Sequence, residues 1–393
     1  MKWTTAISKA PRLETAVEEV CAAVSQEHPD GVDLAVVFVT PHHAIRYRRL
    51  PPLLHDRLAI GELIGCSGGG IVGGGLEVEQ GPALSLTVAS LPEVAMRSFA
   101  LDGEAVQALA NRPLAWRELL ELEPEHEPNF ILLPNPFRCP ADELVTSLDK
   151  AFPDRPKIGG MASGGREASS VALLLRQGVE EAAVVGLALW GDIQVDTAVA
   201  QGCRPIGAPF ILTHCHKNMA IQLDGEPAIR ALDKVYGNLS EEDRHRFRSS
   251  PHVGIGIHSG RRPFRQGDYL LRNVLGVDRD KGVVAFGAHL EVGMEVRFHI
   301  RDAETSVLDL DAVLDRAAQR STNPEGALMF SCVGRGEGLY GVPGHDSRVF
   351  GNYFPGVSLG GFFGNGEIGP VQGHTHLHGY TSAFGLFRSR GWS

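Results

Sequence analysis

The stretch Val357-Ser358-Leu359-Gly360-Gly361-Phe362-Phe363-Gly364-Asn365-Gly366 is a glycine-dense loop with two counterparts earlier in the chain, Ile64–Gly70 and Ile158–Gly165. Each loop follows the start of an apolar run (34–39, 130–133 and 327–330) by 30, 28 and 30 residues, respectively. Each precedes a second apolar run, at 83–88, 171–175 and 380–387. Self-similarity of this kind indicates a repeated architecture.

Helical patterns lie between the first apolar run and the glycine loop. In the second copy Leu144, Val145 and Leu148 recur at helical spacing, and Val349, Phe350 and Phe354 recur in the same way in the third. Each copy is therefore predicted to be a strand–helix–glycine loop–strand unit. The predicted fold class is mixed α/β, with layered β-sheets packed against helices.

A change in the predicted secondary-structure pattern near residue 224 suggests a domain boundary. Shorter strand patterns fill the region between the second and third units, and Asp224-Gly225-Glu226-Pro227 is a turn signal within it. The chain is therefore predicted to divide into domains 1–224 and 225–393.

Composition limits the function classes. The 393 residues are 43% hydrophobic and 21% charged, as in globular proteins, and the net charge of −10 does not favour nucleic acid or an anionic membrane as a partner. Two basic clusters, at residues 46–49 and at Arg261, Arg262 and Arg265, are interpreted as solvated surface or as the rim of an anion site. Six scattered cysteines, and the lack of a signal-peptide pattern or an apolar run of membrane length, predict a cytoplasmic location.

Gly202-Cys203-Arg204-Pro205-Ile206-Gly207 places a thiol beside a guanidinium. A neighbouring arginine lowers a thiol pKa, so Cys203 is a candidate nucleophile if a histidine such as His214 or His216 lies near it. A tight turn before a strand, or a loop lining a ligand site, are the alternatives for this segment.

Two other loops carry candidate ligand-binding residues. Arg335 stands among glycines in 331–338, where its guanidinium is suited to a carboxylate or phosphate; a surface turn is the alternative. Asn365 and Glu367 follow the third glycine loop, and Glu367 needs solvent, a protein partner or a ligand in that apolar context. An ammonium group on a ligand would satisfy Glu367, and so would an internal pair with Arg335.

The run His374-Thr375-His376-Leu377-His378 places three histidines on one side of an extended strand. That arrangement suits metal ligation, but no carboxylate or cysteine partner stands nearby in the sequence. We therefore expect structural histidines here, with neither a metal nor a cofactor.

Taken together, several of these stretches resemble the FIST proteins, whose name denotes an F-box and intracellular signal transduction sensory domain. They are residues 65–69, 202–207, 223–228, 363–370 and 377–381, and the resemblance spans about residues 30 to 388. The resemblance implies FIST N-terminal and C-terminal regions and a sensor of small ligands, with amino acids proposed. It supplies no catalytic residues.

The predicted function is a stand-alone cytoplasmic sensory protein that binds a small metabolite, an amino acid or similar zwitterion, and signals to a protein partner. We expect ligand contacts from residues on several loops: Gly68, Gly164, Cys203, Arg204, Arg335, Asn365, Glu367 and His378. The alternative is a cysteine-dependent hydrolase or transferase that uses Cys203 or Cys66.

Overall fold

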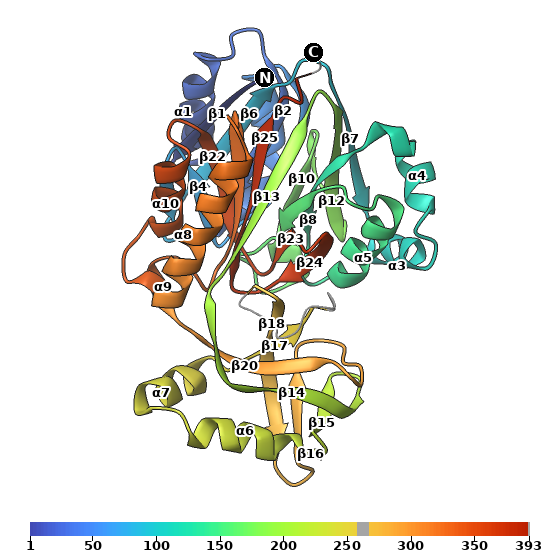
Figure 1. Ribbon diagram of the computed structural model, residues 1–393. Helices are drawn as coiled ribbons and strands as arrows, with labels where there is room; N and C mark the ends of the chain where they lie inside the picture. Colours follow the sequence, from blue (N-terminus) through green and yellow to red (C-terminus); the bar gives the residue numbers. More distant parts are fainter. Residues whose placement is uncertain (258–266, 392–393) are drawn as a thin grey trace. The chain divides into compact units, whose positions relative to one another are not determined.

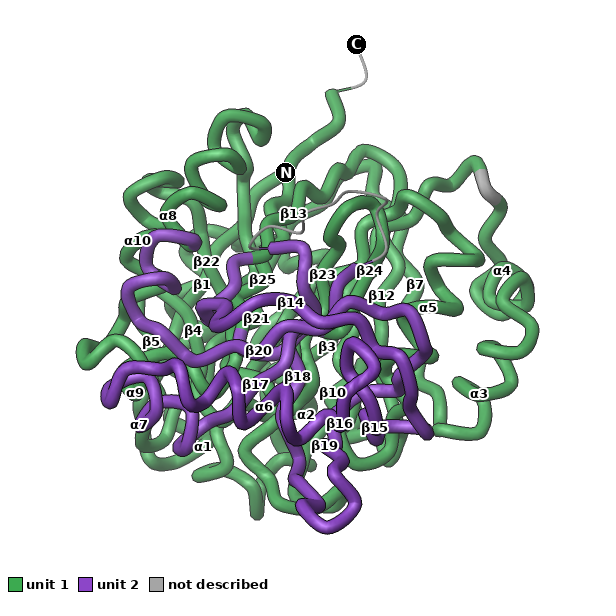
Figure 2. Tube along the Cα trace, turned by 60° about the horizontal axis from the view of Figure 1, so that its bottom comes forward, with its two compact units in different colours: residues 1–199, 310–377, 381–393 green, residues 200–309, 378–380 purple. Residues whose placement is uncertain are grey.

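The structure is a computed structural model that describes residues 1–257 and 267–391 (Figure 1). The basic cluster at Arg261, Arg262 and Arg265 lies outside the described residues. The chain forms two compact units: unit 1 comprises residues 1–199, 310–377 and 381–393, and unit 2 comprises 200–309 and 378–380 (Figure 2). The boundary predicted at residue 224 lies within unit 2, in the turn between β15 (Met219–Leu223) and β16 (Glu226–Pro227). Division into domains 1–224 and 225–393 stays a prediction.

Unit 1 consists of three repeats, each a strand, a helical segment, two strands joined by a further helical segment, a hairpin and a last strand. The first repeat has β1 (Lys2–Ser8), α1 (Leu13–Ser25), β2 (Val32–Val39), α2 (Leu50–His55), β3 (Ile60–Ser67), β4 (Gly70–Gly73), β5 (Leu76–Val78) and β6 (Leu84–Ser90). The second has β7 (Val94–Leu101), α3 (Gly103–Asn111), α4 (Ala115–Leu120), β8 (Asn129–Pro134), α5 (Ala141–Ala151), β9 (Lys157–Gly160), β10 (Leu173–Leu175), β11 (Gly178–Val179) and β12 (Val184–Gly191).

The third repeat begins with β13 (Gln194–Gln201), and most of unit 2 follows it in the chain. The repeat resumes with α8 (Ala303–Arg320), β21 (Gly326–Cys332), α9 (Glu337–Tyr340), α10 (His345–Tyr353), β22 (Ser358–Gly364), β23 (Glu367–Val371), β24 (His374–His378) and β25 (Thr381–Arg388). The α/β class and the threefold layout expected from the glycine loops are therefore confirmed. None of the helices in the described ranges is both long and apolar enough to cross a membrane.

Each repeat centres on a parallel strand pair, namely β2–β3, β8–β9 and β21–β22. At one point in each pair stands a glycine whose added Cβ would meet the neighbouring strand's carbonyl oxygen: Gly65 at 2.0 Å from Val37, Gly159 at 1.9 Å from Leu132 and Gly361 at 2.0 Å from Met329. A side chain there would push the two strands apart. This contact explains why glycine recurs at corresponding places in the sequence.

The three sheets exchange hairpins in a cycle. The strand orders are β1-β6-β2-β3-β10-β11, β7-β12-β8-β9-β23-β24 and β13-β25-β21-β22-β4-β5. The first sheet is thus completed by the hairpin of the second repeat, the second sheet by that of the third, and the third sheet by that of the first. The exchange binds distant segments of the chain into one core, in which Phe38, Phe330 and Phe362 pack with centroids 4.8–6.4 Å apart.

One predicted equivalence differs from the structure. The run 171–175 was matched with 83–88 as the last strand of its unit, but it contains β10, which belongs to the exchanged hairpin. The strand that corresponds to β6 is β12, which pairs antiparallel with β8 just as β6 pairs with β2. Both runs are apolar because both strands are buried, so hydrophobicity alone did not separate them.

Unit 2 is an antiparallel sheet whose pairings close into a ring. The order is β14 (Cys203–His216), β20 (Glu295–Arg301), β17 (His252–Gly256), β18 (Tyr269–Asp278), β19 (Val283–Phe286) and β15, and β15 also pairs with β14. A core of apolar residues from these strands and from α6 (Ala228–Gly237) fills it. Helix α7 (Glu241–Ser249) adds Phe247 to the same core.

Candidate functional site

The three glycine loops meet in unit 1. Ser163 of the second loop donates its hydroxyl to the Phe363 carbonyl of the third (2.5 Å) and accepts the Gly69 amide of the first (2.7 Å). The Met161 amide donates to the Gly366 carbonyl (2.8 Å), which ties the second loop to the third again. The backbones can approach in this way because Gly69, Ser163 and Gly366 have a small side chain or none.

A group of buried and half-buried polar side chains lies beside this junction, and we call it the buried cluster. Its members come from β21 and the loop after it, α9, α10, β23, β25 and the exchanged hairpin β4–β5: Glu77, Ser331, Arg335, Tyr340, His345, Asp346, Glu367, Thr381 and Ser382. An internal pair of Arg335 with Glu367 was one of the two alternatives considered for Glu367. The structure brings both into this cluster.

Arg335 is held by a carboxylate that sequence reasoning missed. Its Nε donates to Asp346 Oδ2 (2.9 Å), its Nη2 to Asp346 Oδ1 (3.3 Å) and to the Tyr340 hydroxyl (2.5 Å). The side chains of Arg335 and Asp346 are 0% and 1% exposed, so the interpretation of Arg335 as part of a surface turn is wrong. Asp346 lies in the first turn of α10, and no local pattern in the sequence indicated that it would face Arg335.

Asp346 is also bound by neutral donors. Ser382 Oγ donates to its Oδ2 (2.5 Å), and His345 Nδ1 lies 3.0 Å from its Oδ1. Burial by itself favours the neutral carboxyl, but Arg335 and these hydrogen bonds hold the pKa of Asp346 well below its usual value. The pair is therefore ionised, and Asp346 already neutralises the charge of Arg335.

Glu367 is fully buried, and no cation of the described residues is bonded to it. Its Oε2 accepts the Thr381 amide (3.1 Å) and hydroxyl (2.9 Å). Burial raises the pKa of Glu367 to about 8, although the Thr381 hydrogen bonds and the positive charge of Arg335 oppose that rise. Among the described residues, neither Glu367 Oε1 nor Arg335 Nη1 has a hydrogen-bond partner.

The exchanged hairpin brings a second acidic group to the cluster. Glu77 of β5 accepts the Ser347 amide at Oε1 (2.6 Å), while its buried Oε2 has no hydrogen-bond partner in the described ranges. Burial, together with the nearby Asp346, raises the pKa of Glu77 to about 7. Two carboxyl groups that prefer to be neutral therefore share the interior with one ionised Arg–Asp pair.

The other predicted residues of unit 1 do not belong to the cluster. The Asn365 side chain is exposed, and the backbone amide of this residue donates to the Met161 carbonyl (3.1 Å). Gly68 and Gly164 are packing positions, since an added Cβ would lie 2.8 Å from Phe362 and 2.4 Å from Pro41, respectively. Cys66 is buried, and burial raises the pKa of its thiol well above the usual value, which disfavours a nucleophilic thiolate.

Cys203, Arg204 and His378 belong to unit 2. Arg204 donates to Asp243 (2.7 Å) within a network that includes Asp302 and Arg246. Cys203 is buried at the start of β14. His214 and His216 lie on the same strand, and at ~3.3 Å per residue they are about 35–45 Å further along it when it is extended. Neither histidine can therefore serve as a base for Cys203.

The residues of the described ranges include no cluster of three or more His, Cys, Asp or Glu side chains suited to a metal ion. His374 and His376 instead line a small pocket with Asp149 and Thr375, where Thr375 donates its amide (2.6 Å) and hydroxyl (2.7 Å) to Asp149.

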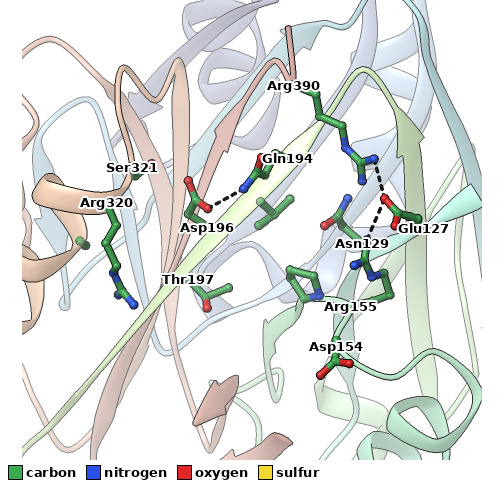
Figure 3. Close-up of a pocket in the computed structure, with 13 residues that line it drawn as sticks. Glu127, Asn129, Asp154, Arg155, Gln194, Asp196, Thr197, Arg320, Ser321 and Arg390 are labelled. Atoms are coloured by element: carbon green, nitrogen blue, oxygen red, sulfur yellow. Dashed lines mark hydrogen bonds and ion pairs between the residues drawn. The ribbon is translucent and has the colours of Figure 1, made fainter. Parts of the chain in front are cut away.

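Unit 1 also contains an open cavity of about 540 Å³ that the sequence did not indicate (Figure 3). It is lined by residues from five separate parts of the chain: Glu127, Asn129, Asp154, Arg155, Pro156, Gln194, Val195, Asp196, Thr197, Ala317, Arg320, Ser321 and Arg390. No two of these parts adjoin in sequence, so no motif marked the cavity.

The family of the chain follows from comparison with known proteins. The FIST N domain model matches residues 33–226 and the FIST C domain model matches residues 228–370. The chain therefore belongs to the FIST family, whose domains are associated with sensory signal transduction and small-ligand binding.

Similar proteins of full length occur in mycobacteria. An uncharacterized protein of Mycobacterium tuberculosis is 32% identical over 385 residues, which cover 97% of this chain and 98% of that protein. Another, of Mycobacterium bovis, is 32% identical over 377 residues, 95% of each chain. Human F-box only protein 22 is 32% identical over 108 residues, 25% of this chain and 27% of that protein.

Proposed function

We propose that this protein is a cytoplasmic sensor that binds a small zwitterionic metabolite, such as an amino acid, in the buried cluster and signals its presence to a protein partner. The observation that carries the proposal is the pair of unsatisfied groups: a guanidinium nitrogen of Arg335 and a carboxylate oxygen of Glu367, both buried. Unpaired buried polar atoms are costly, and a polar guest would remove that cost. A ligand carboxylate suits Arg335 Nη1, and a ligand ammonium suits Glu367 Oε1.

A closed site is suited to a sensor, because the ligand can enter only if the covering segment moves. The segment 333–344 carries Arg335 and Tyr340, and its outer side chains Val333 and Val342 are exposed. Three glycines at 336, 341 and 344 have φ values of 68°, 71° and 66° and can absorb changes in backbone direction. Glu79 holds the segment in place by accepting the Glu337 amide (2.8 Å). Displacement of this segment would be the signal that a partner reads.

The raised pKa of Glu367 gives the binding a measurable signature. A ligand ammonium favours the ionised carboxylate, so binding near pH 7 releases up to one proton from Glu367. Affinity therefore rises between pH 6 and pH 8.

The test is a thermal-shift screen of the twenty amino acids, followed by calorimetry of any hit in buffers of different ionisation enthalpy. Glu367→Gln, which imitates the neutral carboxyl, should bind about tenfold more weakly and release no proton. Glu118→Gln on the exposed side of α4 is the matched control and should behave like wild type. Equal affinity of Glu367→Gln and wild type would exclude the proposed site, and so would a screen in which no amino acid raises the melting temperature.

A further inference from the structure

The cavity of Figure 3 has arginines on two opposite sides. Arg155 precedes β9 and Arg390 follows β25, and both point to one carboxylate, Glu127, which lies 3.1 Å from Arg155 Nη1 and 2.8 Å from Arg390 Nη1. Two guanidinium groups therefore share a single negative charge on this side.

Arg320, the last residue of α8, lies across the cavity from that pair (Figure 3). Its Nε donates to the Arg316 carbonyl (3.3 Å), and within the described ranges no carboxylate forms an ion pair with it. The next residue, Ser321, lines the same side and is 3% exposed, and its Oγ has no hydrogen-bond partner in the part of the chain that the structure describes. A charged donor and a buried hydroxyl are thus both available to a ligand.

The acidic groups around the cavity leave a surplus of positive charge. Asp196, on β13, accepts hydrogen bonds from Arg388 Nε (2.9 Å) and Gln194 Nε2 (3.1 Å), so it is already neutralised. Asp154 lies at the edge of the cavity and points away from its centre (Figure 3). What remains facing the centre is Arg320 on one side and the incompletely neutralised pair Arg155–Arg390 on the other.

We propose that this cavity is a second ligand site, distinct from the buried cluster, and that it binds a small metabolite with an anionic oxygen group at each end. The groups are carboxylates or phosphates, since guanidinium binds both through the same pairs of N–H donors. Arg320 and Ser321 bind one end, and Arg155 and Arg390 bind the other. A volume of about 540 Å³ suits a compound of metabolite size.

Calorimetry at constant ionic strength tests the proposal with three probes: succinate and inorganic phosphate, which carry two charges or nearly so, and acetate, which carries one. Succinate should bind wild type most tightly, because it alone of the three carries an anionic group at each end. Arg320→Gln should lose about tenfold in succinate affinity. Arg316→Gln, on the same helix but outside the lining, is the matched control and should bind like wild type.

Several results would overturn the proposal: no binding of succinate or phosphate to wild type, equal affinity of Arg320→Gln and wild type, or equal losses in Arg320→Gln and Arg316→Gln. Arg155→Gln provides a second variant for the other side of the cavity and should lose affinity to a similar degree. Because Glu367 does not line the cavity, Glu367→Gln should bind succinate normally. The proposals for the cavity and for the buried cluster are therefore tested independently of each other.

Discussion

The buried cluster and the cavity use the same chemistry, arginine against carboxylate, in opposite surroundings. The side chains of Arg335 and Asp346 are 0% and 1% exposed, whereas those of Arg390 and Glu127 are 20% and 45% exposed. In the interior each charge must be matched, because desolvation of an unpaired ion is costly. Beside solvent, two arginines can share one carboxylate at little cost. The first arrangement is therefore expected to be sensitive to the loss of either partner, whereas the second is expected to leave charge available for a ligand.

The largest effect on the free energy of unfolding is expected from breaking the Arg335–Asp346 ion pair. Asp346→Asn leaves the Arg335 guanidinium buried without a counterion, and the free energy of unfolding should fall by about 3–5 kcal/mol. The corresponding change at the cavity, Asp196→Asn, removes the partner of Arg388 at a site that is about a quarter exposed, and should cost at most about 1 kcal/mol. Urea denaturation of both variants measures the difference. Similar losses in the two would mean that burial does not distinguish the regions.

The second effect is on the pH dependence of the free energy of unfolding, to which Glu367 and Glu127 contribute with opposite sign. The pKa of Glu367 is raised by burial to about 8, so its folded state keeps a proton that the unfolded state releases near pH 4.5. Its contribution to stability is therefore complete below pH 4.5 and is lost as the pH rises towards 8, by at most about 1.4 kcal/mol per pH unit. Hydrogen bonding from Arg390, and the charge of Arg155, lower the pKa of Glu127, so its contribution is present above pH 4.5 and is lost as the pH falls.

Unfolding by urea at pH 5.5 and pH 8.5 measures the Glu367 contribution, because the Glu127 contribution changes only below about pH 4.5. Glu367→Gln should be less sensitive than wild type to the rise in pH, while Glu118→Gln should follow wild type. Glu77 titrates in the same direction as Glu367, with a pKa raised to about 7, so part of the dependence should persist in Glu367→Gln. An unchanged pH dependence in Glu367→Gln would show that this carboxyl is ionised in the folded protein.

The sequence predicted the repeat because its physical cause is local. Gly65, Gly159 and Gly361 each lie against the carbonyl of a neighbouring strand, and that requirement leaves a visible mark at regular spacing. The exchange of hairpins has no such signal in the sequence, because β10 is an apolar strand whichever sheet it joins. The fold class and the repeated units were therefore predictable, whereas the sheet partners were not.

The residues of the candidate sites likewise divide into those that the sequence indicated and those that it did not. Arg335 and Glu367 stood out because charged residues are unusual among glycines and apolar residues, and the structure places them in one cluster. Their partner Asp346 and the acidic Glu77 were missed because long-range packing alone brings them there. The cavity was missed for a related reason: an arginine at the end of a helix, such as Arg320, is usual, and only the tertiary arrangement sets it opposite Arg155 and Arg390.

The smallest effect on stability, and the sharpest test of the comparison, is expected at Glu127. Removing its charge in Glu127→Gln leaves Arg155 and Arg390 near solvent, so the fold should tolerate the change. The same change removes the carboxylate that competes with a bound anion, and succinate affinity should rise several-fold. Calorimetry of Glu127→Gln against wild type measures this gain. A loss of affinity would instead mean that Glu127 positions the two arginines, and that an exposed carboxylate can organise a site as firmly as the buried Asp346 does.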